Sequence, residues 1–142
     1  MDKQVGRVVA VLMAAMVSTA AFAGRTLPLI EPGRVALHAS AASAPVAARD
    51  VRRAVLTGGR LHDWQLKNEA PGVLTLEAGH GTHRVTVDVN YDATGYEIKY
   101  RDSVEMNYDV EDGKPVIHPK YNKWVMDLDS AIRSEARAFG FR

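Results

Sequence analysis

Apolar and charged positions follow their most regular pattern near the end of the chain. Between residues 119 and 139 the apolar positions recur at spacings of three and four, which places them on one face of an α-helix. They are Tyr121, Trp124, Val125, Leu128, Ala131, Ile132, Ala136 and Phe139. Pro119 suits the first helical turn, and Gly140 suits the end. The pattern predicts one long amphipathic helix over 119–139, with Asp129 on its exposed face.

A second, shorter apolar stripe lies in the first half of the chain. Its members are Val46, Ala47, Val51, Ala54 and Val55. Pro45 fits the first turn of a helix, and Ser43 can cap it. Gly58-Gly59 is expected to end this helix, because glycine commonly follows the last helical residue.

Between these stripes the hydrophobic period changes to two, which is typical of half-buried strands. The clearest strand covers 85–91, where Val85, Val87, Val89 and Tyr91 alternate with Thr86, Asp88 and Asn90. Turns of a few residues favour an antiparallel meander. The four predicted strands cover residues 64–67, 73–78, 85–91 and 96–108, and the predicted turns cover 68–72, 79–81 and 92–95.

Asp102 conflicts with the alternation in the fourth predicted strand. Strict alternation places this carboxylate inside the fold with Val104 and Met106. An unpaired carboxylate is costly to bury. We therefore expect a bulge or bend at residues 101–103, with a buried partner for Asp102 as the alternative.

The order of these elements predicts an α+β fold. We expect a two-layer sandwich, in which a short N-terminal helix and a long C-terminal helix cover one face of a four-stranded antiparallel meander. This domain spans residues 45–142, and a flexible segment over 24–44 precedes it. Within that segment, residues 35–38 fit a short edge strand.

The first 23 residues have the pattern of an export signal. Lys3 and Arg7 form a short basic region, an uncharged apolar run follows, and Ala21-Phe22-Ala23 supplies the small residues that a signal peptidase reads. The apolar run is shorter than the roughly 20 residues that span a bilayer. We predict cleavage after Ala23 and a periplasmic or secreted protein without a transmembrane span; the alternative is a retained membrane anchor.

Composition narrows the classes of function. The formal net charge of the chain is +1, and it becomes zero once Asp2, Lys3 and Arg7 leave with the signal. This balance is not the basic footprint of a nucleic-acid-binding protein. The chain has no cysteine, which excludes thiolate catalysis, cysteine-based zinc sites and lipid attachment at an N-terminal cysteine. No motif indicates a cofactor, and the glycine pairs are too short for a phosphate-binding loop.

Several motifs carry a resemblance. The run Ile117-His118-Pro119-Lys120-Tyr121-Asn122-Lys123-Trp124-Val125 follows Tyr96-Glu97-Ile98-Lys99-Tyr100, and Trp64 lies ahead of a Pro-Gly turn. Over roughly residues 47–132 the chain resembles a group of small exported proteins and lipoproteins of proteobacteria that have no assigned function. The resemblance implies an envelope location and an α+β domain, and it supplies no activity. The chain departs from the lipoproteins because it lacks their cysteine.

The densest polar and aromatic cluster surrounds the start of the long helix. Its candidate binding or structural residues are Asp102, Ser103, His118, Tyr121, Asn122 and Trp124. His118 is a candidate general base if Asp102 or Asp109 orients it. The structural interpretation is favoured: His118 caps the helix, Asn122 fixes its entry, and Tyr121 and Trp124 are buried. Ser103 lacks the motif of a hydrolase nucleophile.

His80 and His83 form the second candidate site. Two histidines three residues apart can chelate zinc or copper. In one strand, however, positions i and i+3 point to opposite faces, and no acidic residue of the same turn completes the shell. We therefore interpret both as residues of a hairpin turn.

These observations favour a non-enzymatic envelope domain over an enzyme. We expect it to bind a partner protein, peptide, lipid or glycan through the open sheet face or through the cleft between the sheet and helix 119–139. The alternative is a small metal-binding protein or hydrolase-like enzyme that uses His118 with Asp102, or His80 with His83.

Overall fold

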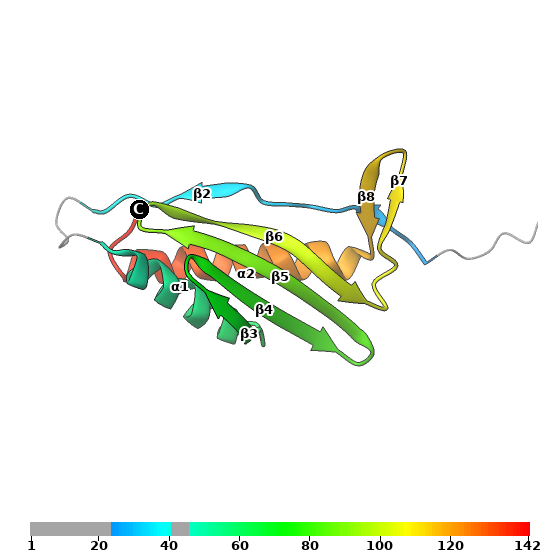
Figure 1. Ribbon diagram of the computed structural model, residues 1–142, viewed down its shortest axis with the longest axis horizontal. Helices are drawn as coiled ribbons and strands as arrows, with labels where there is room; N and C mark the ends of the chain where they lie inside the picture. Colours follow the sequence, from blue (N-terminus) through cyan, green and yellow to red (C-terminus); the bar gives the residue numbers. More distant parts are fainter. Residues whose placement is uncertain (1–23, 41–45) are drawn as a thin grey trace, which may run out of the picture.

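Two helices and two antiparallel sheets make up residues 24–40 and 46–142, the part of the chain that the computed structural model describes (Figure 1). The predicted α+β class is confirmed. The helices are α1 (Ala48–Leu61) and α2 (Pro119–Ala138). The strands are β1 (Leu27–Pro28), β2 (Arg34–Ala36), β3 (Gln65–Ala70), β4 (Val73–His80), β5 (His83–Asp92), β6 (Gly95–Val104), β7 (Asp109–Glu111) and β8 (Lys114–Ile117).

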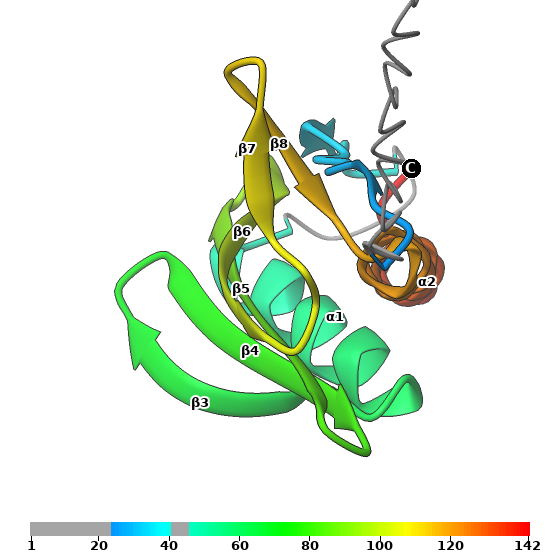
Figure 2. The ribbon, with the colours of Figure 1, turned by 90° about the vertical axis from the view of Figure 1, so that its right-hand side faces the viewer.

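The larger sheet has five strands, in the order β2-β6-β5-β4-β3. The prediction of four strands was therefore wrong, because residues 34–36 pair with β6 and extend the meander. The register places Leu74, Val89 and Ile98 side by side across β4, β5 and β6. All three are buried, and they form part of one core with the helices. Both helices lie on the same side of this sheet (Figure 2).

Gly58 and Gly59 lie inside α1, so the prediction that they end this helix was wrong. The reason is a contact with the other helix. A Cβ atom at Gly58 would lie 2.8 Å from the backbone nitrogen of Ile132 in α2. The glycine therefore serves close helix packing, and α1 continues for another turn, to Leu61.

The long C-terminal helix is confirmed within one residue of its predicted end. Pro119 occupies its first turn, and Gly140 follows it with a left-handed φ of 92°. Asp129 is the exception to the predicted faces, because it is buried rather than exposed. Its carboxylate accepts hydrogen bonds from the hydroxyl of Tyr96 and from Nε of Arg133. These partners offset the cost of burying the charge.

The expected bulge beside Asp102 is present in β6. Thr86 of β5 pairs with Asp102, but the next residue, Val87, pairs with Tyr100. Arg101 is therefore the extra residue, and Asp102 is exposed. The strand ends at Val104, four residues earlier than predicted.

A second sheet, in the order β1-β8-β7, was not predicted. It joins a hairpin near residue 113 to the segment that follows the predicted export signal. Asn122 of α2 holds this segment, since its side chain donates to the carbonyl of Pro28 and accepts from the backbone N–H of Ile30. The sheet adds a small layer beside the start of α2 (Figure 2).

Two predictions fall on residues outside the described part of the chain. They are the export signal over 1–23 and the helix start at Ser43 and Pro45. Residues 24–40, which precede the predicted domain, carry β1 and β2. None of the helices within residues 24–40 and 46–142 is long and apolar enough to cross a membrane.

Candidate functional site

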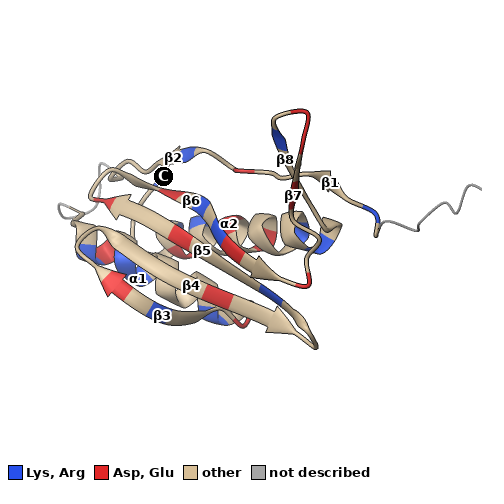
Figure 3. Ribbon diagram, turned by 45° about the vertical axis from the view of Figure 1, so that its right-hand side comes forward, with Lys and Arg blue, Asp and Glu red and all other residues tan. Residues whose placement is uncertain are grey.

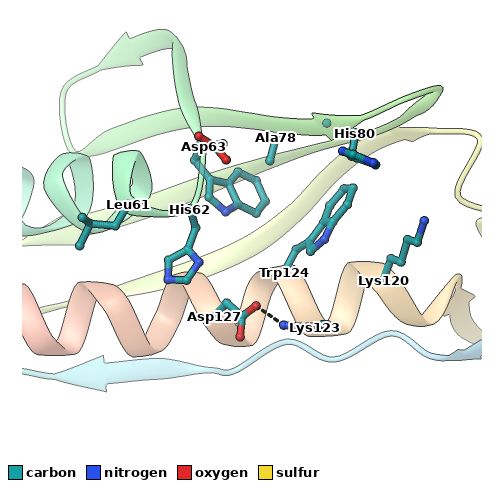
Figure 4. Close-up of a pocket in the computed structure, with 11 residues that line it drawn as sticks. Leu61, His62, Asp63, Ala78, His80, Lys120, Lys123, Trp124 and Asp127 are labelled. Atoms are coloured by element: carbon teal, nitrogen blue, oxygen red, sulfur yellow. Dashed lines mark hydrogen bonds and ion pairs between the residues drawn. The ribbon is translucent and has the colours of Figure 1, made fainter.

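A cleft of about 540 Å³ opens between the end of α1, the end of β4 and the first half of α2 (Figure 4). Its volume lies within the range of about 300–1,000 Å³ that is typical of ligand sites. The cleft lies between the large sheet and α2, which is one of the two binding locations that the sequence suggested. Residues 61–64, residues 78–80, and Lys120, Lys123, Trp124 and Asp127 line it.

The chain forms the α1 side of the cleft by leaving the helix sharply. The backbone N–H groups of His62 and Trp64 both donate to the carbonyl of Gly59, at 3.0 and 2.9 Å. Asp63 lies between them in the left-handed region, with a φ of 59°. Non-glycine residues seldom adopt this conformation. The turn buries the indole of Trp64 and leaves Leu61 on the rim, where 64% of its surface is exposed.

Aromatic surface is available in the cleft. Trp64 is 2% exposed and belongs to the core. Trp124 is only partly buried, and Figure 4 shows its indole between α2 and β4, near His80. Trp124 therefore lies on the predicted apolar face and packs against the core, but part of its ring remains exposed. A tryptophan with an apolar ring and an N–H donor suits a surface that is partly wet.

The charges of the cleft are only partly compensated. Nζ of Lys123 lies 2.6 Å from Oδ2 of Asp127, so these two charges neutralise each other. Lys120 and Asp63 have no ion-pair partner within the described residues. Figure 4 shows them toward opposite ends of the cleft. The ammonium of Lys120, on the α2 side of the cleft, is therefore available to pair with an anionic group of a ligand.

The open face of the large sheet offers less free charge. Basic and acidic residues are interspersed along its strands (Figure 3). Asp88 accepts from Thr75 and Arg101, and Lys99 lies 3.0 Å from Glu31. Glu77 lies within ion-pair distance of Lys67 and Arg84. Exposed pairs of this kind are typical of a solvated surface, and they favour the cleft as the candidate site.

The predicted pair of His118 and Asp102 is not formed. Oδ1 of Asp102 accepts from the backbone N–H of Ser103, and Oγ of Ser103 lies 2.9 Å from the hydroxyl of Tyr100. His118 instead meets His83, with ring centroids 5.4 Å apart in an edge contact. Among the described residues no hydrogen bond joins an acidic side chain to either imidazole. The arrangement lacks the carboxylate that would orient a catalytic histidine.

His118 has the structural role that was favoured. Its Nδ1 accepts from the backbone N–H of Lys120 at 3.1 Å, which caps α2. Its own backbone N–H donates to the carbonyl of Met106 at 2.7 Å. Partial burial, then the neighbouring His83 and Lys120, lower the pKa of His118 from its usual value. Nδ1 accepts a hydrogen bond only in the neutral ring, so the cap and the pKa shift agree.

The remaining residues of the predicted cluster lie in different surroundings and do not form one site. Tyr121 is buried, and its ring meets that of Tyr100 edge-on, with centroids 5.6 Å apart. Burial also raises the pKa of Tyr121 above its ordinary range, so its hydroxyl stays protonated. Asn122 holds the N-terminal segment, as described above. Of the six predicted residues, only Trp124 lines the cleft.

His80 and His83 are neighbours across a hairpin, not residues of one strand. They pair directly as the last residue of β4 and the first of β5. Directly paired residues share a face of the sheet, so the argument that they point to opposite faces was wrong. His80 lines the cleft, whereas His83 contacts His118. No group of three potential metal-binding side chains occurs within residues 24–40 and 46–142.

The other residues that complete the cleft were not predicted. Leu61, His62 and Asp63 lie where the shorter predicted helix had already ended, and Lys120 was named only as part of the motif that starts at Ile117. Only the change of period after Leu61 marked this region. A cleft built from three elements far apart in the sequence leaves no local pattern by which it can be recognised.

Comparisons of the chain with protein-family models, with curated proteins and with solved structures give no match in any of the three. The candidate site therefore rests on its own geometry: a half-buried indole, a free lysine and two exposed imidazoles around one cleft.

Proposed function

We propose that the protein is an exported, non-enzymatic binding module and that the cleft beside Trp124 is its ligand site. Export rests on the pattern of residues 1–23, with cleavage after Ala23. The resemblance to small exported proteins of proteobacteria agrees with this location. The ligand belongs to the cell envelope or to the medium that surrounds it.

One observation supports the choice of site: the exposed part of the Trp124 indole lies in the same cleft as the ammonium of Lys120, which has no ion-pair partner within residues 24–40 and 46–142. An apolar surface and a few convergent polar groups are the usual composition of a ligand pocket. Such a site favours a ligand that combines an apolar body with an anionic group. His62 and His80 add hydrogen-bonding groups along the walls.

Binding is favoured over catalysis by the role of His118. Its Nδ1 is already engaged in the helix cap, and its ring neighbour is another imidazole. A general base needs a free nitrogen and usually a group that orients the ring. The metal-binding alternative would need a third ligand beside His80 and His83, and no group of three potential ligands occurs in the described part of the chain.

The test is a thermal-shift screen of the purified protein. Peptides, fatty acids, sugars and amino acids are added to the unmodified protein, to Lys120→Glu and to the control variant Lys114→Glu. Lys114 is exposed and lies on the β7–β8 hairpin, outside the cleft. We expect at least one compound to raise the melting temperature of the unmodified protein and of Lys114→Glu, and to have a much smaller effect on Lys120→Glu. A compound that stabilises all three proteins equally argues against the cleft, and a screen without any stabilising compound argues against the binding function.

A further inference from the structure

Among the described residues, no strand pairs with the end of β4 on the side of the cleft. β3 pairs with β4 only as far as Gln65 and Glu77, whereas β4 continues to His80. β3 begins only at Gln65, since the backbone N–H of the preceding residue, Trp64, already donates to the carbonyl of Gly59 in α1. Residues 78–80 therefore present an open strand edge, about 10 Å long, to the cleft that they line.

Gly79 directs its backbone polar groups toward this open edge. His80 and His83 are the closing pair of a two-residue hairpin, so the N–H and C=O of His80 point toward β5. Successive residues of an antiparallel strand point these groups in opposite directions. The N–H and C=O of Gly79 therefore point away from β5. Gly79 is exposed, and a glycine without a side chain lets another backbone approach closely.

The edge strand β3 of the same sheet is protected against pairing with another strand, whereas residues 78–80 of β4 are not. The pairing of β3 with β4 is interrupted by a bulge at Lys67, and Arg52 of α1 forms a two-pronged ion pair with Glu69. Bulges and charged side chains are the usual means by which an edge strand avoids pairing. The open edge at Gly79 has neither, and it lies inside a cleft.

We propose that the cleft binds an extended peptide, which adds to β4 as a short strand through the N–H and C=O of Gly79. A bulky apolar side chain of the peptide packs against the exposed part of Trp124. An acidic side chain or a free C-terminal carboxylate pairs with Lys120. Backbone hydrogen bonds then supply affinity, and the side-chain contacts supply selectivity.

This inference rests on the proposed function and specifies its ligand. Lipids and fatty acids can use Trp124 and Lys120, but they have no backbone donor and acceptor to match the C=O and N–H of Gly79. A peptide uses all three features of the cleft: the edge, the indole and the ammonium.

The experiment uses a phage-displayed library of random seven-residue peptides, selected in parallel on the unmodified protein, Lys120→Glu and Lys114→Glu. We expect enriched peptides on the unmodified protein and on Lys114→Glu that place an acidic residue near a bulky apolar one. On Lys120→Glu this acidic preference should be lost. No enrichment on the unmodified protein overturns the proposal.

The strand geometry is tested with the most enriched peptide, made in a normal form and with its central backbone nitrogens methylated. Methylation should weaken binding about tenfold, because it removes the N–H that pairs with the carbonyl of Gly79. Bound normal peptide should slow hydrogen exchange of the Gly79 amide, since a paired amide is protected. Equal binding of both forms, or unchanged exchange at Gly79, overturns strand addition.

Different results would contradict the two proposals, which are that the cleft binds a ligand and that this ligand is a peptide. If the thermal-shift screen finds a cleft-dependent ligand and no peptide is enriched, the binding function stands and the peptide ligand is wrong. If no ligand of any class is found, the binding function itself is wrong.

Discussion

The hydroxyl of Tyr96 donates a 2.7 Å hydrogen bond to Oδ1 of Asp129, which ties the central sheet to the C-terminal helix. Both residues are buried, at 0% and 5% exposure. Arg133 donates to the other carboxylate oxygen at 2.8 Å. Burial, followed by the hydrogen bond to Asp129, raises the pKa of Tyr96 above its ordinary range, so this hydroxyl remains a donor at any physiological pH.

Tyr96→Phe is expected to destabilise the protein by about 1.5–3 kcal/mol, because it removes a hydrogen bond to a charged group that stays buried. Tyr108→Phe is the matched control, since Tyr108 is 44% exposed and its ring stacks on Tyr100 without needing its hydroxyl. Urea unfolding of the two variants measures the difference. Equal stability of both variants would show that the Tyr96 hydroxyl contributes nothing.

Alanine substitutions at Gly58 and Gly59, two neighbouring residues of α1, distinguish the effect of helix propensity from that of packing. Alanine is the better helix former by about 1 kcal/mol, so propensity alone predicts that both substitutions stabilise. At Gly58 the added Cβ would lie 2.8 Å from a backbone atom of α2, whereas at Gly59 its nearest contact is 3.4 Å away. We expect Gly58→Ala to cost about 1–3 kcal/mol through overpacking and Gly59→Ala to be near neutral. Thermal unfolding measures the stability of both variants. Equal stabilities would contradict the packing explanation.

The lowered pKa of His118 predicts that the stability of the protein depends on pH. The folded protein has a lowered pKa at this residue, so between that value and the usual value of about 6.5 the unfolded chain binds more protons. This contribution to stability is present above about pH 6.5 and is lost as the pH falls through the folded pKa. His118→Asn keeps a cap acceptor without the titrating ring. Its unfolding midpoint should decline less between about pH 7 and about pH 5 than that of the unmodified protein. Parallel declines would remove His118 as the cause.

The two tryptophans of the chain should report different environments. Trp64→Ala is expected to cost about 3–5 kcal/mol, the usual range for a buried tryptophan, and Trp124→Ala clearly less. In single-tryptophan variants, Trp64→Phe and Trp124→Phe, iodide should quench the fluorescence of Trp124 and spare that of Trp64. The reverse order of quenching would place Trp124 in the core and remove it from the cleft.

The export prediction has a separate test in the mass of the protein recovered from the periplasm of a Gram-negative host. Cleavage after Ala23 gives a chain that starts at Gly24. Ala23→Arg should prevent processing, because the peptidase reads a small residue there. A full-length mass for the unmodified protein would support the retained anchor.

The sequence pattern predicted those helices and strands whose buried face imposes a regular spacing of apolar residues. The stripe from Tyr121 to Ala136 and the alternation from Val85 to Val89 identified α2 and β5, since a buried helix face and a half-buried strand each impose a period. The conflict at Asp102 correctly indicated the bulge. Residues 35 and 36 of the predicted edge strand do pair with β6.

Most of the wrong predictions involve partners that are distant in sequence, whereas the error at His80 and His83 came from missing a tight hairpin. Gly58 resembles a helix end until α2 is packed against it, and Asp129 resembles a surface residue until Tyr96 reaches it. β1 is two residues long and contains Pro28, so it has no periodicity to detect. The cleft joins three separate segments, and the sequence indicated its general location and, among its lining residues, Trp124 and His80.

The most direct test of the cleft as the ligand site follows the indole N–H signals of Trp64 and Trp124 by ¹H–¹⁵N NMR. The protein is titrated with a compound that stabilises it in the thermal-shift screen. We predict that the Trp124 signal moves to saturation and that Lys120→Glu suppresses the movement. Saturable binding that leaves the Trp124 signal in place would contradict the account.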